Sequence, residues 1–233
     1  MKRQFDPGEP ELMDRPQPVT PELERDLHNL RQLNRYFGSY ALTGHFLRRW
    51  MKPTKRYRVL DIATGSGDIP RLVVEYAKKI GAFATVHAID QQESTLEIAR
   101  TSSADYPAIH FERADALSFQ SDEPYDIVLC SLALHHFGDE AAVQLLRRCA
   151  ELSRGFVLVS DLRRGLLASV GVYFLTTFIF REPMTRVDGR LSAARAFSFS
   201  EFRSLAERAG WKNFRQRKFR FARQAIWLES PME

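Results

Sequence analysis

Short hydrophobic blocks recur between residues 56 and 162, and they alternate with longer stretches in which apolar positions follow a helical period. The blocks predict five strands, over residues 57–62, 84–90, 109–113, 125–130 and 155–160. The stretches between them predict helices over residues 70–80, 94–102 and 141–152. Strands that are apolar on both faces and separated by helices are typical of a parallel sheet covered on both sides. We therefore expect an α/β fold.

The segment before this alternating region has a different character. Residues 1–19 are charged and contain four prolines, which favours a loose arm. Thr20 and Pro21 have the residue types of a helix N-cap and first turn, and leucines follow at helical spacing. We expect residues 1–45 to form an arm and a helical segment, which is either a structural flap or a lid over a substrate.

The segment after the fifth predicted strand is nearly all apolar over residues 165–180. This length is below the roughly 20 residues that a helix needs to cross a bilayer, so the pattern favours a buried helix. Arginines 163, 164 and 181 flank it, which leaves contact with a membrane surface open. The polar residues 182–196 that follow predict a loop.

The last part of the chain predicts a helix over residues 200–209 that ends at Gly210, followed by strands over residues 214–221 and 224–229. The arginines here, Arg223 among them, are expected to face solvent. The chain as a whole then divides into residues 1–45 and a domain of residues 46–233, with an apolar helical insertion at about 163–197.

Composition narrows the class of protein. Hydrophobic residues make up 44% of the 233, which is enough for a substantial core and too many for a disordered chain. The net charge of +5 is spread along the chain, so nucleic-acid binding is not expected. The two cysteines form no CxxC or Cys/His cluster, so no metal site is predicted. With no secretory signal in residues 1–19, we expect a cytoplasmic protein; its oligomeric state stays open.

The strongest chemical motif is the glycine-containing loop after the first predicted strand, where residues 59–68 read VLDIATGSGD. Gly65 and Gly67 allow a tight turn and a close approach of the backbone to a ligand. A dinucleotide-binding fingerprint would continue to a third glycine or alanine, but Pro70 stands at that position.

Two carboxylates also flank this loop. Asp61 and Asp68 would repel the pyrophosphate of a dinucleotide, whereas S-adenosylmethionine carries an ammonium and a sulfonium, which carboxylates attract. The acids therefore favour S-adenosylmethionine over NAD.

Acids also end the next two predicted strands. Asp90 lies 23 residues after Gly67 and is placed to accept hydrogen bonds from two ribose hydroxyls. Asp115 follows the third strand, where it can accept a hydrogen bond from an adenine amino group. For Asp90 the alternative is an ordinary cap at the end of a strand.

Over about residues 40–230 the chain resembles the class I S-adenosylmethionine-dependent methyltransferases. The resemblance implies a Rossmann-like, mostly parallel seven-stranded sheet with helices on both faces, closed by a C-terminal antiparallel hairpin. The small-molecule branch, which includes quinone and polyketide methyltransferases, looks most similar. Ala63 stands where many members have a first glycine. The resemblance implies a cofactor site made of Asp61, Ala63, Gly65, Gly67, Asp68, Asp90, Gln91, Asp115, Ala116 and Ser131.

Candidate catalytic residues follow the fourth predicted strand. His135 and His136 are expected beside the methyl group, and an oxygen nucleophile of high pKa needs a base. Asp161 ends the neighbouring fifth strand and could orient one imidazole, as in a catalytic triad. Some sugar O-methyltransferases of this superfamily look similar here. The alternative is that each histidine only caps the chain or packs against the cofactor.

Three functions remain open. The first is O-methylation of a small molecule, the second is C-methylation of a quinone or polyketide ring, and the third is a methyltransferase-like binding protein without catalysis. A nucleic-acid methyltransferase would usually show an Asn/Asp-Pro-Pro-aromatic motif, and the chain reads CSLA after Leu129. We expect an aromatic or polyketide-like substrate under a lid formed by the N-terminal segment and residues 165–180. Arg186, Arg190 and Arg195 are expected mainly to face solvent, and pairing of one of them with a phenolate or carboxylate of the substrate is the alternative.

Overall fold

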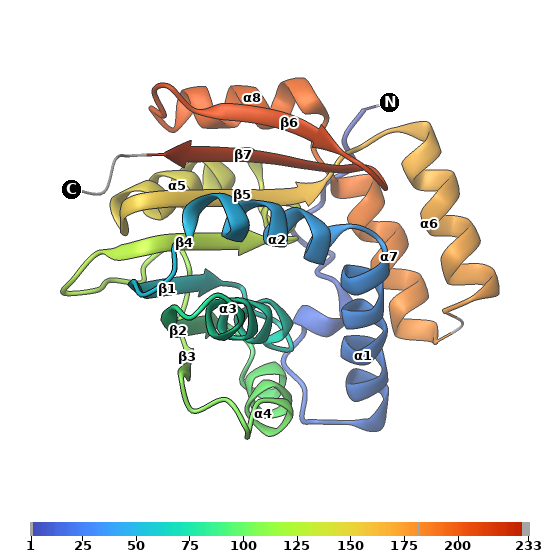
Figure 1. The fold of residues 1–233 in the computed structure, drawn as a ribbon. Coiled ribbons are helices and arrows are strands. Elements are labelled where there is room, and N and C mark those ends of the chain that lie inside the picture. Colours follow the sequence, from blue (N-terminus) through green and yellow to red (C-terminus); the bar gives the residue numbers. More distant parts are fainter. Residues whose placement is uncertain (1, 181, 230–233) are drawn as a thin grey trace.

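The computed structural model describes residues 2–180 and 182–229, except for the side chains of residues 166–169, and shows a seven-stranded sheet with helices on both faces (Figure 1). The strands are β1 (Arg56–Ile62), β2 (Phe83–Asp90), β3 (Ile109–Arg113), β4 (Tyr125–Ser131), β5 (Ser153–Leu162), β6 (Arg215–Phe219) and β7 (Arg223–Glu229). Their order is β3-β2-β1-β4-β5-β7-β6. The strands β1 to β5 are parallel, and β7 runs antiparallel to both β5 and β6. The predicted fold class and its closing hairpin are confirmed.

Five helices flank the sheet, and their apolar spacing explains which side each one buries. The helices α2 (Ser39–Trp50) and α3 (Asp68–Lys79) pack on one face, while α5 (Asp139–Glu151) and α8 (Phe199–Arg208) pack on the other. The fifth, α4 (Glu93–Ser102), contacts β2 and β3. Ile69, Val73 and Ala77 recur every four residues along α3 and are all buried, as expected for one helical stripe against a sheet.

Three more helices lie beyond the carboxyl ends of the parallel strands, at the right of Figure 1. These are α1 (Pro21–Tyr36), α6 (Leu166–Phe178) and α7 (Pro183–Arg195). Thr20 caps α1 as predicted, because its hydroxyl oxygen accepts a hydrogen bond from the N–H of Leu23 at 3.2 Å. Two single-turn helices, η1 (Leu12–Asp14) and η2 (Leu134–His136), lie next to α7.

Three sequence predictions outside the sheet are wrong. Residues 2–14 pack against α7 and η2 rather than forming a loose arm, because backbone and side-chain hydrogen bonds hold them there. Residues 183–195 are helical and not a loop. The helix α7 begins with its own signal, since Glu182 accepts a hydrogen bond from the N–H of Thr185 at 2.9 Å and Pro183 occupies the first turn.

The third error concerns α6, which was expected to be buried. Its outward side chains are 56–59% exposed; they are Val170, Tyr173, Phe174, Phe178 and, just past its end, Ile179.

The prediction for Arg223 is also wrong. It was expected in solvent and is only 6% exposed, at the start of β7. Among the residues that the structure describes, no helix combines the length and the apolar character needed to cross a membrane. Arg181, one of the predicted flanking arginines, lies outside the described residues.

Candidate active site

A cavity of about 1070 Å³ opens where the carboxyl ends of the parallel strands meet α1, α6, α7 and η1. This is the edge at which open α/β sheets bind ligands. Nine of the ten predicted cofactor residues line it: Asp61, Ala63, Gly65, Asp68, Asp90, Gln91, Asp115, Ala116 and Ser131. The tenth, Gly67, is not among the lining residues.

The loop after β1 bends through left-handed backbone conformations. Ala63 has φ +56°, Gly65 has φ +55° and Gly67 has φ +71°. A left-handed residue other than glycine is strained by about 1–2 kcal/mol, so the alanine at 63 stands at a position that suits glycine better. At Gly67 an added Cβ would lie 2.8 Å from the ring of Phe111, so this glycine is needed for packing as well as for the turn.

Three carboxylates gather at the β1 and β2 end of the cavity. Burial raises the pKa of Asp61 to about 8, and the neighbouring charges of Asp68 and Asp90 act in the same direction. Burial also raises the pKa values of Asp68 and Asp90. A nearby cation stabilises the ionised form of a buried carboxyl group whose pKa is raised. This cluster of carboxyl groups therefore suits a cationic ligand.

Asp68 and Asp90 are also held in place by hydrogen bonds from the protein. Asp90 accepts hydrogen bonds from the N–H groups of Gly65 at 2.9 Å and Gln92 at 3.0 Å, which ties the glycine loop to the end of β2. The amide nitrogen of Asn34, on α1, donates to Asp68 at 3.0 Å. The helix α1 therefore contributes directly to this end of the cavity.

Asp115 and Ser131 lie farther along the same wall. Asp115 is exposed and accepts a hydrogen bond from the N–H of Leu117 at 3.0 Å, so it also stabilises the turn after β3. The hydroxyl of Ser131 accepts from Ser160 on the adjacent strand at 3.2 Å.

His135 and Asp161 form a buried pair on the far side of the cavity. Nδ1 of His135 lies 2.6 Å from one carboxylate oxygen of Asp161, and the N–H of His135 donates to the other at 2.9 Å. Burial alone would raise the pKa of Asp161, but the charge and hydrogen bond of His135 outweigh it, and the pKa is lowered. The structure thus brings the predicted histidine and acid together, although Asp161 itself lies behind the imidazole and does not line the cavity.

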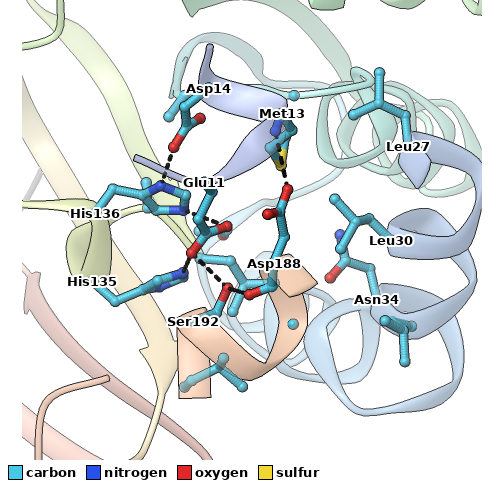
Figure 2. Close-up of a pocket in the computed structure, with 18 of the residues that line it drawn as sticks. Glu11, Met13, Asp14, Leu27, Leu30, Asn34, His135, His136, Asp188 and Ser192 are labelled. Atoms are coloured by element: carbon cyan, nitrogen blue, oxygen red, sulfur yellow. Dashed lines mark hydrogen bonds and ion pairs between the residues drawn. The ribbon is translucent and has the colours of Figure 1, made fainter. Parts of the chain in front are cut away.

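His136 has its own carboxylate partner, and sequence reasoning missed it. Nδ1 of His136 lies 2.6 Å from Asp14, and both imidazoles point with Nε2 toward Glu11 (Figure 2). Although burial works in the opposite direction, Glu11 and Asp14 raise the pKa of His136 to about 10. Glu11 is 2% exposed and accepts a hydrogen bond from the hydroxyl of Ser192 at 2.8 Å.

The segment that carries Glu11 and Asp14 is fixed at several points. Asp188 accepts the N–H groups of Leu12 and Met13 at 2.8 and 3.0 Å, and burial raises the pKa of Asp188 to about 6. Arg3 donates to the carbonyl of Phe137 at 2.7 Å. No sequence signal marked residues 2–14, because the partners that hold them lie 78 to 192 residues away along the chain.

The expected lid residues divide between the cavity and solvent. Phe37 lines the cavity, and Phe174 also reaches it although it is 56% exposed, whereas Tyr36 and Tyr173 do not line it and are 63% and 57% exposed. Arg186, Arg190 and Arg195 do not line it. Arg190 instead stacks on Tyr173, and Arg195 donates to backbone carbonyls of the segment before α1. The arginines that do reach the cavity are Arg31, Arg163 and Arg223.

Comparison with known proteins finds similarity to methyltransferases in sequence. Residues 59–154 match the family model described as a methyltransferase domain. The chain is 29% identical over 139 residues to the ubiquinone biosynthesis O-methyltransferase of Albidiferax ferrireducens, covering 55% of this chain and 52% of that protein. The chain therefore spans about half the length of the curated relative that it matches.

Solved structures support the fold. The plantazolicin methyltransferase in complex with SAH and a desmethyl plantazolicin analogue has a TM-score of 0.64 and 13% identity, over 90% of this chain and 97% of that one. The CMeT domain of the citrinin polyketide synthase has a TM-score of 0.60 and 12% identity, over 81% of this chain and 50% of that chain. At these identities the likeness concerns the fold.

Proposed function

We propose that this chain, whose residues 59–154 match a methyltransferase-domain family model, transfers a methyl group from S-adenosylmethionine to an oxygen of a small, mostly apolar acceptor. One observation carries the proposal: a single cavity has a cluster of buried carboxylates at one end and an oriented imidazole at the other. The first end suits a cationic methyl donor, and the second suits an acceptor that must lose a proton.

The residues present fit the donor. S-adenosylmethionine supplies an electrophilic methyl group on a sulfonium. Asp61 and Asp68 would hold its cationic methionine portion, since both are buried and carry raised pKa values that a neighbouring cation would relieve. Asp90 keeps lone pairs for the ribose hydroxyls beyond the two backbone N–H groups that it accepts.

The acceptor end is apolar apart from a few polar groups, as small-molecule sites usually are. Leu27, Leu30, Phe37 and Phe174 are among the apolar residues that line the cavity. Arg223 is buried there, and its Nη1 has no hydrogen-bond partner among the described residues. Burial lowers the pKa of Arg223 to about 10, so an anionic group on the acceptor would stabilise this guanidinium. We assign to Arg223 the role that the sequence had suggested for arginines on α7.

His135 is the group we assign to the acceptor's proton. Asp161 holds Nδ1, so that the Nδ1 proton donates to the carboxylate and the Nε2 lone pair is directed toward the cavity. His136 is the weaker candidate for a base, because its raised pKa keeps it protonated near neutral pH. A phenol or enol fits both the apolar lining and Arg223. The cytoplasm is the compartment we propose, with both cysteines as buried thiols.

Calorimetry and product analysis test the proposal. The protein should bind S-adenosylmethionine in the micromolar range and should not bind NAD. With a panel of alkylated phenols and enolic pyrones, mass spectrometry and NMR should locate the new methyl group on oxygen. Binding of NAD alone would refute the donor assignment, and a methyl group found only on carbon would refute O-methylation.

A further inference from the structure

Two imidazoles converge on one carboxylate, which is more than a general base requires. Nε2 of His135 lies 3.7 Å from one oxygen of Glu11, and Nε2 of His136 lies 3.8 Å from the other (Figure 2). Both separations exceed hydrogen-bond length. The ligating atoms of the three side chains lie within 4.8 Å of one another, and all three residues line the cavity.

The opposite ring nitrogens have the partners that metal-binding histidines have. Nδ1 of His135 is held by Asp161 and Nδ1 of His136 by Asp14, both at 2.6 Å. A carboxylate on the far nitrogen fixes the tautomer and directs the Nε2 lone pair toward a metal ion. Both His135 and His136 have this arrangement, and the Nε2 atoms of both face the same carboxylate, that of Glu11.

The spacing also suits a small cation. Zinc bonds of about 2.0–2.2 Å to nitrogen and oxygen, at a tetrahedral angle, separate two ligand atoms by about 3.3 Å. The observed 3.7 and 3.8 Å would have to shorten by only a few tenths of an ångström. Glu11 is held in position by the hydroxyl of Ser192, which leaves its second oxygen directed at His136.

A second group of the same residue types, on the sheet, serves as an internal comparison. Nε2 of His87 hydrogen-bonds directly to Glu112 at 2.8 Å, and its Nδ1 lies 2.7 Å from the hydroxyl of Tyr125. His110 completes this group and is exposed. Here the nitrogen that would bind a metal is already hydrogen-bonded, which is not so for the cluster around Glu11.

Charge balance favours the same conclusion. Glu11, Asp14 and Asp161 bring three carboxylates to two imidazoles. With one imidazole protonated, the three carboxylates leave a formal charge of −2, and a dication that takes the place of that proton brings it to −1. Glu11 is 2% exposed and Asp161 is fully buried, so compensation matters here more than it would in solvent.

We propose that His135, His136 and Glu11 form a binding site for a divalent transition-metal ion, of the two-histidine, one-carboxylate type that zinc occupies in hydrolytic enzymes. Its role in the reaction rests on the proposed function. The ion would face the cavity and acidify the acceptor's hydroxyl in place of a free imidazole, and Asp161 and Asp14 would then be positioning residues.

The test is metal binding by the full chain after EDTA treatment and desalting. Calorimetry with Zn²⁺ and visible absorption with Co²⁺ should each give one equivalent. Glu11→Gln and His136→Asn should weaken binding at least 10-fold, and Asp14→Asn about 10- to 100-fold. His110→Ala, which disrupts only the comparison group, should leave binding unchanged. Near-UV circular dichroism and S-adenosylhomocysteine binding in EDTA establish that each variant is folded.

Absence of binding in the wild type, binding undiminished in folded Glu11→Gln and His136→Asn, or its loss in His110→Ala would each overturn the metal site. None of these readouts requires turnover. Metal binding without any methyl transfer would instead refute the proposed function and leave the metal site standing.

Discussion

The two ends of the cavity differ in how the chain supplies their charges. At the cofactor end, Asp61, Asp68 and Asp90 are acids whose pKa values are raised, with too little positive charge around them. At the acceptor end, Asp14 and Asp161 are acids whose pKa values are lowered by histidines. The first end depends on its ligand for neutralisation, whereas at the second end histidines of the protein itself offset part of the negative charge. Binding of the donor and chemistry on the acceptor should therefore respond to different substitutions.

Removal of the imidazole at 135 should have the largest effect. His135→Ala should lower the rate at saturating donor by about 10²–10⁴-fold, because the acceptor loses the group that handles its proton. Affinity for S-adenosylhomocysteine, measured by calorimetry, should stay within about twofold of the wild type. Full activity in His135→Ala would make this histidine structural, and lost donor binding would show that the two ends are not separable.

The buried acid on α1 should make the acceptor end sensitive to pH. Asp26 accepts a hydrogen bond from the hydroxyl of Thr185 at 2.6 Å, and burial raises the pKa of Asp26 to about 7 from its usual 3.8. Because the folded state favours the protonated form, its contribution to stability is complete below pH ~4 and is lost as the pH rises through about 7. Between pH 5 and pH 8 this loss is at most about 3 kcal/mol.

Asp26→Asn keeps the hydrogen-bond acceptor and removes the titration. Urea unfolding at the two pH values should show a smaller decrease in the free energy of unfolding for the variant than for the wild type. Equal decreases would show that ionisation of Asp26 does not destabilise the fold. Subtracting the variant's decrease from the wild-type decrease removes the contributions of Asp61 and Asp188.

At the cofactor end, Asp90→Ala should weaken donor binding by roughly 1.5–3 kcal/mol, since charge-assisted hydrogen bonds to the ribose are lost. Calorimetry with S-adenosylhomocysteine measures this. Asp122→Ala, an exposed acid outside the cavity, is the control and should bind normally. The rate of Asp90→Ala at saturating donor should recover most of the wild-type value. Unchanged affinity would remove Asp90 from the site.

The smallest expected change comes from the cap of α1. Thr20→Ala removes the side-chain acceptor for Leu23 and should lower stability by about 1 kcal/mol. Thr20→Ser keeps the acceptor and should restore the wild-type value. If α1 supports both ends of the cavity equally, donor affinity and turnover will fall together; a decrease in turnover alone would assign the helix to the acceptor end.

The same contrast explains what sequence reasoning could reach. The parallel strands were predicted within about two residues. Each is a short block that is hydrophobic on both faces and lies between segments with a helical period, so the local sequence is enough to identify it. The cofactor end follows from that pattern, since its acids and glycines directly follow strands whose ends must meet at one edge. The placement of nine of those residues in one cavity agrees with it, while their contacts with the donor remain a prediction.

The acceptor end was harder because its parts are distant in the chain. Glu11 and Asp14 lie in a proline-rich, charged segment whose composition predicts disorder, and the groups that hold it, such as Asp188 and His136, lie far away in the chain. The polarity of residues 183–195 concealed a helix whose buried side is itself polar, with Thr185, Asp188 and Arg195. The α6 helix was wrongly expected to be buried, since apolar composition does not reveal which surface remains uncovered.

The hydrogen bonds that hold residues 3–13 against α7 and its flank join groups 175 to 192 residues apart. Contacts between groups so far apart in the chain form late in folding, because a very large loop must first close and the entropy lost on closure comes before the stabilisation by the contacts. We expect the sheet to form first, with the strand ends that carry Asp61 and Asp90 in place and the acceptor side still open. In pulsed hydrogen exchange during refolding, the amides of Leu12 and Met13 should become protected after those of β1, so that the site which performs the chemistry is the last to assemble.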